Sequence, residues 1–343
     1  MLYIHRASCI SPQQTFSEIN VEHVVAPLNN KLHVIEPAYE AIPRNMLRRM
    51  GKAVRIGVGA SLPVLHDARL DGFIIGTANG GMEESILFLK QIIDYDEGVL
   101  TPGSFVQSTA NATAAQLSLL TTNHGYNITH VHRGLAFENA AIDAAMMVKE
   151  NKSATYLLGG IDDISNYNYK LDYMDGWYKE DVLNSQSLYD TNTPGSIAGE
   201  GAAIFLVNDN EQNALAKLSA IKTLHTADVD LIKREFSLFL QQHIGSNPFL
   251  FLSGENGDSR LQPFYASCEE VLATDSTIVR FKHLCGEYPT ASAFAVWLSC
   301  QLLNGLPMTG HMIKRQGSSE QTSSIVIYNN HKNVQHSFML IEN

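Results

Sequence analysis

The sequence predicts an α/β protein built from two similar halves. The first half has a strand-like run at Asn127–His132, then a glycine, then an Ala-rich helix at Ala136–Lys149. The second half repeats this layout with a strand at Thr277–Phe281, a glycine and a helix at Thr290–Leu303. Because both helices are hydrophobic nearly all round, we expect them to lie inside the protein.

Other short strands next to glycine turns support this fold class. Strands that alternate with helices of ten or more residues are typical of a sheet whose two faces are both covered. The polar stretch Asn208–Asn213 separates the halves, which we assign to residues 1–210 and 211–343. The additional predicted strands are Gly72–Gly76, Tyr156–Leu158 before a turn at Gly159-Gly160, Ala202–Val207, Pro248–Leu252, and a terminal hairpin of Ser323–Tyr328 and Phe338–Ile341 around Asn329-Asn330.

Composition and charge exclude several classes of protein. The 343 residues are 45% hydrophobic, enough for a large core, and carry a formal net charge of -11 that argues against nucleic-acid binding. The basic stretch Arg44–Arg55 is interpreted as the solvated face of a helix. Ala291–Leu303 is too short to span a bilayer, and no signal peptide is recognised, so we expect a cytoplasmic protein that does not bind membranes. The four cysteines lack a CxxC pair and are predicted to be free thiols.

A series of ordered motifs resembles the β-ketoacyl-acyl-carrier-protein synthases of the thiolase superfamily. The motifs are a glycine turn at Gly76–Gly81, an interface helix at Ser108–Leu120, Ala140–Ala145, Leu157–Gly160, the GEGA segment in Pro194–Ala203, and Lys282–Ala293. This resemblance implies a five-layered αβαβα thiolase-like fold from two duplicated halves, usually in a dimer. It also implies catalysis by a cysteine at a helix start, where the dipole activates the thiol, together with two histidines.

All three of these catalytic positions differ here. The resemblance places the nucleophile at Leu135, which cannot carry an acyl group, and the two histidines at Ser253 and Glu287. Only Lys282 is retained. The glycine-rich gating loop is also missing, since residues 329–334 read NNHKNV.

Other residues near these positions have simpler interpretations. We expect Lys282 and Glu287 to form a buried ion pair rather than an acid/base couple. His132, His283 and Cys285 are candidates to line the old pocket, but Cys285 lacks the helix start that activates a thiolate. His130 and His132 share one side of a strand without a third ligand, so we predict no metal, and no cofactor is expected.

The resemblance then implies a chain-length factor, a subunit that lacks the nucleophile and pairs with an active ketosynthase and an acyl carrier protein. The products in question are polyketides, aryl-polyene or flexirubin-type pigments, or fatty acids. The interface segment falls at Ser104–Gln116, and its tunnel candidates are Ser104, Phe105, Gln107, Ser108 and Thr109.

Two alternatives remain open at this point. One is a self-sufficient acyltransferase or malonyl decarboxylase whose pocket is rebuilt from Ser253, Lys282, His283 and Glu287. The other is a homodimeric protein that binds acyl groups. An enzyme would turn over malonyl thioesters unaided, whereas a binding protein would carry lipid without a partner.

Overall fold

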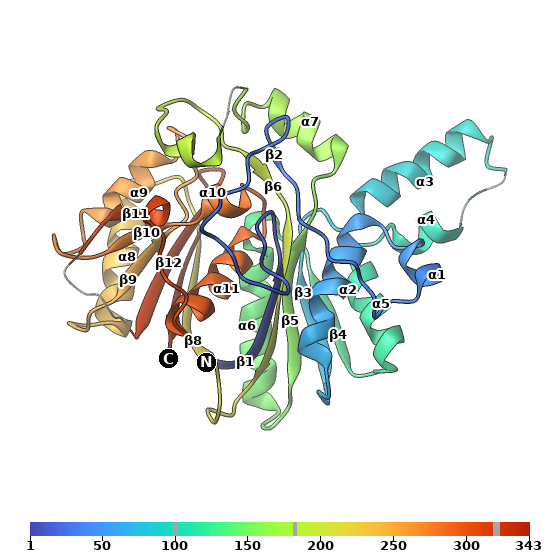
Figure 1. Ribbon diagram of the computed structural model, residues 1–343, viewed down its shortest axis with the longest axis horizontal. Coiled ribbons are helices and arrows are strands. Elements are labelled where there is room, and N and C mark those ends of the chain that lie inside the picture. The colour runs from blue at the N-terminus through green and yellow to red at the C-terminus, as the bar shows by residue number, and fades with distance from the viewer. Residues whose placement is uncertain (99, 101, 181–183, 318–322) are drawn as a thin grey trace.

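Two five-stranded arrays with the same topology form the framework of the computed structural model, which describes residues 1–98, 100, 102–180, 184–317 and 323–343 (Figure 1). In spatial order, the first array is β4 (Tyr126–His130), β3 (Gly72–Gly76), β5 (Tyr156–Asp162), β7 (Gly201–Asn208) and β1 (Leu2–Ile10). The second is β10 (Ile278–Arg280), β9 (Leu250–Ser253), β12 (Ser324–His331), β13 (Gln335–Glu342) and β8 (Ala216–His225). Numbered along the chain within its half, each array reads 3-2-4-5-1, so the structure has the internal duplication that the sequence predicts.

The strand directions are duplicated as well. In each array the first three strands in spatial order run parallel, and the last two pair antiparallel. The arrays meet where β1 pairs antiparallel with β8, through Leu2 opposite Leu218. In the described residues, β11 (Ile313–Arg315) extends the outer edge at β10, and β2 (Lys31–Leu32) and β6 (Ala198–Gly199) form a separate small sheet.

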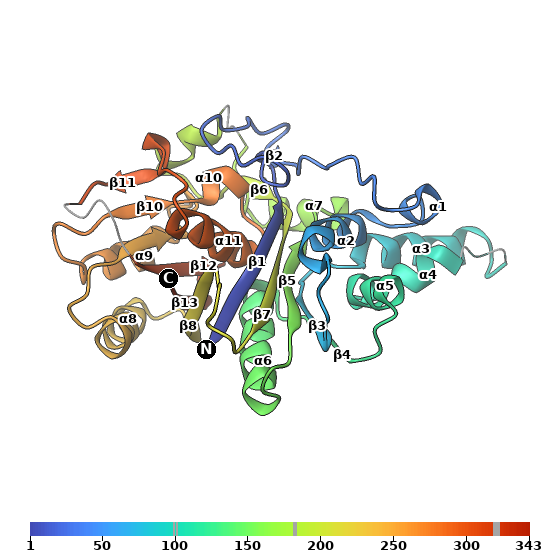
Figure 2. The same cartoon turned by 60° about the horizontal axis from the view of Figure 1, so that its bottom comes forward.

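Helices complete five layers, which Figures 1 and 2 show from two directions. On β7, Phe205 and Val207 face one core while Ile204 and Leu206 face another, as the two-residue period of a strand requires. The outer layers are α2 (Lys52–Leu65) with α5 (Ala112–Thr121), and α8 (Val229–His243) with α9 (Gln262–Glu269). The middle layer is α6 (Ala136–Glu150) and α11 (Ala291–Leu303).

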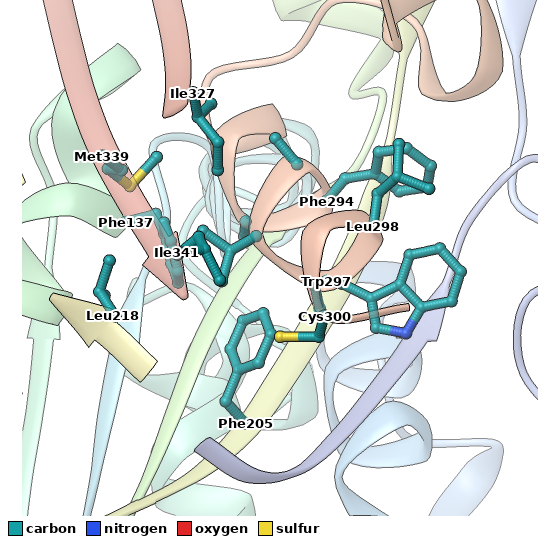
Figure 3. Close-up of a cluster of buried hydrophobic side chains, with 14 of the residues drawn as sticks. Phe137, Phe205, Leu218, Phe294, Trp297, Leu298, Cys300, Ile327, Met339 and Ile341 are labelled. Carbon is teal, nitrogen blue, oxygen red and sulfur yellow. The ribbon is translucent and has the colours of Figure 1, made fainter. Parts of the chain in front are cut away.

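Side chains from both arrays pack around α11 in the middle layer (Figure 3). Ten consecutive residues of this helix, Ala291–Cys300, are buried, which explains why its sequence is apolar on every side. The labelled neighbours come from α6, β7, β8, β12 and β13: Phe137, Phe205, Leu218, Ile327, Met339 and Ile341. The expectation that both Ala-rich helices are internal is therefore confirmed.

Shorter elements surround this framework. They are α1 (Arg44–Leu47), α3 (Met82–Asp94), α4 (Pro102–Gln107), α7 (Asn166–Met174), α10 (Lys282–Cys285) and the 3-10 turns η1 (Arg133–Leu135), η2 (Ser185–Tyr189) and η3 (Gly310–Met312). In both ribbon views α3 and α4 extend to one side of the body. No helix in the described part of the chain is long and apolar enough to cross a membrane.

Three local predictions are wrong. Gly159-Gly160 lies inside β5 rather than in a turn. Glycine is needed at position 160 because α11 packs closely there: a Cβ on Gly160 would stand only 2.5 Å from the Cβ of Ala293. Asn329-Asn330 belongs to β12, and the hairpin turns at Lys332 and Asn333, whose φ angles are 53° and 66°. The basic stretch at residues 44–55 does not lie on one helix: it contains α1 (Arg44–Leu47) and the first turn of α2, which begins at Lys52.

Candidate functional site

Leu135 lies at the start of the buried helix α6, at the end of the 3-10 turn η1. Its side chain is 5% exposed and belongs to the core. The preceding Gly134 donates its backbone N–H to Oε1 of Gln335 at 2.9 Å, and a Cβ on Gly134 would stand 2.2 Å from the Cβ of His331. The β12–β13 hairpin therefore packs directly against this helix start, and the position offers no nucleophile.

Lys282 and Glu287 form the buried ion pair that their spacing predicts. Nζ of Lys282, which is fully buried, donates to Oε2 of Glu287 at 2.9 Å. Nδ2 of Asn256 donates to the same carboxylate oxygen at 2.8 Å. The backbone of Glu287 also bonds to Ile197 and Gly199, so α10 and the GEGA segment are fixed to each other.

The environment keeps Glu287 ionised. Burial by itself raises the pKa of this carboxyl, but the Lys282 ammonium and His331 outweigh burial and lower the pKa to about 2. The second carboxylate oxygen, Oε1, faces Nδ1 of His331 across 3.7 Å, which is too long for a direct hydrogen bond. A carboxylate in this state does not act as a general base near neutral pH.

His283 belongs to a different cluster from Glu287. Its Nδ1 lies 3.1 Å from the hydroxyl of Tyr189, and its Nε2 lies 2.8 Å from Nδ1 of His311. Burial, with smaller contributions from His311 and Arg280, lowers the pKa of His283 to about 3, so the imidazole is neutral. The side chain is thus committed to a chain of hydrogen bonds and does not line the pocket described below.

Cys285 is a buried core residue. Its Sγ donates to the backbone carbonyl of Gly286 at 3.3 Å, and burial raises the pKa of its thiol. Burial likewise raises the pKa of the other three thiols, Cys9, Cys268 and Cys300. None of the four has the exposed, electropositive surroundings of a reactive thiolate.

The remaining candidate positions are dispersed. Ser253 ends β9, where its hydroxyl accepts the backbone N–H of Glu255 at 3.3 Å. His132 is exposed beyond the end of β4, and its Nδ1 lies 3.3 Å from Nε2 of Gln335. His130 instead pairs with Asp143, Nε2 to Oδ2 at 2.8 Å. The two histidines of this strand therefore do not share a site.

A pocket lies between α7 and the Lys282–Glu287 pair. It has about 580 Å³ of empty space, its open mouth included. The polar residues that line it are Asn79, Asp163, Ser165, Asn168, Asp172, Asn256, Glu287, His331 and Lys332, and the aromatic ones are Tyr169, Trp177, Tyr178 and Tyr288. Of the predicted site residues only Glu287 lines it. His331 and Asn256 were not predicted, and the replacement of the gating-loop glycines by NNHKNV was the sequence signal that pointed to this hairpin.

Asp162, at the carboxyl end of β5, fixes the glycine turn above the pocket. Its carboxylate accepts the backbone N–H groups of Ala78 and Asn79 at 2.9 and 2.8 Å and the hydroxyl of Thr290 at 2.9 Å. Gly81 ends the turn with a left-handed φ of 77°, and a Cβ there would stand 2.7 Å from the carbonyl oxygen of Thr109. The turn therefore positions the segment after α4.

The predicted interface segment has one exposed aromatic side chain and one bound amide. Phe105 is 60% exposed, and its ring packs against that of Phe88 with centroids 5.3 Å apart. Gln107 accepts the backbone N–H of Gly51 at 2.6 Å and donates to the carbonyl of Arg49. Ser108 accepts the hydroxyl of Ser85 through its backbone carbonyl at 2.6 Å. Phe105 is thus exposed at the surface, whereas Gln107 connects α4 to the backbone of Arg49 and Gly51.

Comparison with known proteins agrees with this geometry. Residues 25–172 match the family model described as beta-ketoacyl synthase, N-terminal domain. The resemblance to β-ketoacyl synthases is confirmed. No curated protein sequence matches the chain significantly.

Solved structures show that the thiolase-like ketosynthase fold extends over the whole chain. A β-ketoacyl synthase from Burkholderia phymatum STM815 is 14% identical and superimposes with a TM-score of 0.77, covering 100% of this chain and 99% of its own. The ishigamide ketosynthase/chain length factor is 12% identical, with a TM-score of 0.76 and coverage of 99% of both chains. A ketosynthase in complex with its chain length factor from Xenorhabdus doucetiae is 12% identical, with a TM-score of 0.75 and coverage of 99% and 97%. At these identities the match establishes the fold.

Proposed function

We propose that this chain is a non-catalytic ketosynthase-like subunit, a chain-length factor, that pairs with an active ketosynthase served by an acyl carrier protein. The observation that carries the proposal is Leu135 at the start of α6, where the ketosynthase resemblance places the nucleophile. An aliphatic side chain there cannot hold a growing chain as a thioester. Two of the structural neighbours are described as ketosynthase and chain length factor assemblies.

The contacts of Glu287 and His283 support a structural role for the region that corresponds to the ketosynthase active site. Lys282 and Asn256 already occupy one oxygen of Glu287, and His283 is bound to Tyr189 and His311. A general acid or base needs a pKa near the working pH, and the pKa values of Glu287, about 2, and His283, about 3, lie far below neutrality. These contacts also disfavour the self-sufficient enzyme, because His283 and Glu287 belong to separate clusters.

The partner surface is proposed to be the side of the molecule that carries α3, α4 and the free edge of β4. β4 ends the sheet, so one row of its backbone groups is unpaired within the described chain. Phe105 and Val106 of α4 are 60% and 68% exposed, and Ile93 of α3 is 75% exposed. The other large apolar residues exposed on this side are Met82, Leu87, Leu89, Tyr95, Ile128 and Val131. Apolar patches of this extent mark protein interfaces.

Capture by a cysteine-bearing ketosynthase tests the proposal. The chain, co-expressed with a tagged, cysteine-bearing ketosynthase from the same organism, should co-purify as a stoichiometric complex, and alone it should not decarboxylate malonyl carrier protein. Phe105→Ala should change product length while the complex persists. Leu238→Ala, which trims an exposed leucine on α8, is the matched control and should leave product length unchanged. Turnover by the isolated chain, or failure to bind any ketosynthase, would overturn the assignment.

A further inference from the structure

The pocket beneath α7 contains two buried polar atoms that face each other without a direct hydrogen bond. Oε1 of Glu287 and Nδ1 of His331 lie 3.7 Å apart, within ion-pair range, and no described residue forms a hydrogen bond to either atom. The His331 side chain is 8% exposed and that of Glu287 is 12% exposed, and both residues line the pocket. Buried polar groups without hydrogen bonds are costly, so a small polar group placed between these two atoms, either a water molecule or part of a larger ligand, would be stabilising.

The charges around the pocket restrict what that group is. Lys282 already neutralises Glu287, and Lys332 neutralises Asp172 at the rim. A ligand carboxylate or phosphate would meet the free oxygen of Glu287, and a ligand ammonium would add a second cation to a carboxylate that already has one. A neutral group that both donates and accepts a hydrogen bond avoids the repulsion of an anion and the burial of a second cation. A hydroxyl oxygen placed about 2.8 Å from each atom spans the 3.7 Å gap, with its proton directed to Glu287.

The walls of the pocket suit an apolar body attached to that hydroxyl. Tyr178 and Tyr288 line the pocket, and the ring of Tyr169 on α7 stacks on Tyr178 with centroids 5.1 Å apart. Trp177 adjoins them, held by the guanidinium of Arg260 at 4.0 Å from its ring. Apolar and aromatic walls with a few convergent polar groups are typical of small-molecule sites.

We propose that this pocket binds a neutral alcohol or phenol whose hydroxyl bridges Glu287 and His331 and whose apolar body lies against Tyr178 and Tyr288. The site is independent of the proposed ketosynthase partner. Failure of ligand binding would leave the capture experiment unaffected, and failure of capture would leave this site unaffected.

Calorimetric titration of the purified full chain with matched small molecules tests the proposal. 4-Methylphenol represents a phenol, cyclohexanol an aliphatic alcohol, and toluene is the control that lacks the hydroxyl. At least one hydroxyl probe should bind, and toluene should bind at least about tenfold more weakly than 4-methylphenol if the phenol is the ligand type. Benzoate and benzylamine, which carry the disfavoured charges, should not bind. Which hydroxyl probe binds tighter identifies the ligand type.

Variants locate the binding in the pocket. His331→Phe keeps a ring against Gly134 and removes the ring nitrogen Nδ1. It should weaken the binding of the hydroxyl probe at least about tenfold. The double variant Lys282→Met/Glu287→Leu removes the acceptor oxygen without leaving a buried charge unpaired, and it should have the same effect. His243→Phe, on the outer helix α8, is the control and should bind like the wild type. Binding of neither hydroxyl probe, equal binding of toluene and 4-methylphenol with no cyclohexanol binding, or unchanged affinity in both pocket variants would overturn the proposal.

Discussion

Replacing Glu287 by Gln should destabilise the protein strongly, because the fully buried Lys282 would then keep its charge without a counter-ion. The shift of the Glu287 pKa from 4.5 to about 2 corresponds to about 3 kcal/mol of stabilisation. Breaking a buried pair by removing one partner costs about 3–5 kcal/mol. For 343 residues the unfolding entropy is about 0.7 kcal/mol per kelvin, so Tm should fall by about 4–7 °C.

Urea unfolding at pH 7, followed by the fluorescence of the buried Trp297, measures this loss directly. The double variant Lys282→Met/Glu287→Gln should recover most of the stability, since no charge remains unpaired. The pH dependence provides a second check. Because the folded pKa of Glu287 lies below the unfolded value, its contribution is complete above about pH 4.5 and is lost as the pH falls toward 2. This account is refuted if the free energy of unfolding of Glu287→Gln lies within about 1 kcal/mol of the wild-type value, or if the double variant is as unstable as Glu287→Gln.

Three further outcomes follow from the same region. Gly134→Ala should lower the free energy of unfolding by about 1–3 kcal/mol, because the new Cβ would stand 2.2 Å from that of His331; an unchanged denaturant midpoint would contradict this packing. Burial lowers the pKa of His283 to about 3, so the stability from its neutral imidazole is complete above pH 6.5 and decreases as the pH falls toward 3. His283→Gln should flatten that decrease in acid-unfolding curves, and an unaltered curve would count against it. The four buried thiols are those of Cys9, Cys268, Cys285 and Cys300. Iodoacetamide should label them slowly in the native chain and completely in the guanidinium-unfolded chain, as measured by mass spectrometry. Rapid labelling of the native chain would show that a thiol is accessible.

The duplicated strand-glycine-helix units were predictable because their helices are apolar on every side. α6 and α11 need no surface face, so composition alone indicated their burial. β1 and β8, where the halves meet, were not predicted. β1 carries His5 and Arg6 in its middle, and β8 alternates only weakly, so neither has the pattern of a buried strand. Their pairing is a tertiary effect that the local sequence does not encode.

The candidate site was predictable only where its residues are close in sequence. Lys282 and Glu287 lie five positions apart across a glycine, and their pairing follows from that spacing together with the resemblance. Asn256, in the loop after β9, and His331, at the end of β12, reach the same carboxylate, and no local pattern connects them to it. Gly160 was misplaced for a related reason: glycine signals a turn and a close helix contact equally well, and only the position of Ala293 distinguishes the two.

The strand pairing where the two arrays meet also determines when β1 can fold during translation. β1 pairs with β7 through Ile4 and Val207 and with β8 through Leu2 and Leu218, so both of its neighbours emerge from the ribosome long after it does. At about 5–20 residues per second, translation of that interval takes roughly 10–40 s. During this time β1 has neither of its two partner strands, so a chaperone that holds the nascent chain is more important here than for a fold whose strands pair in order.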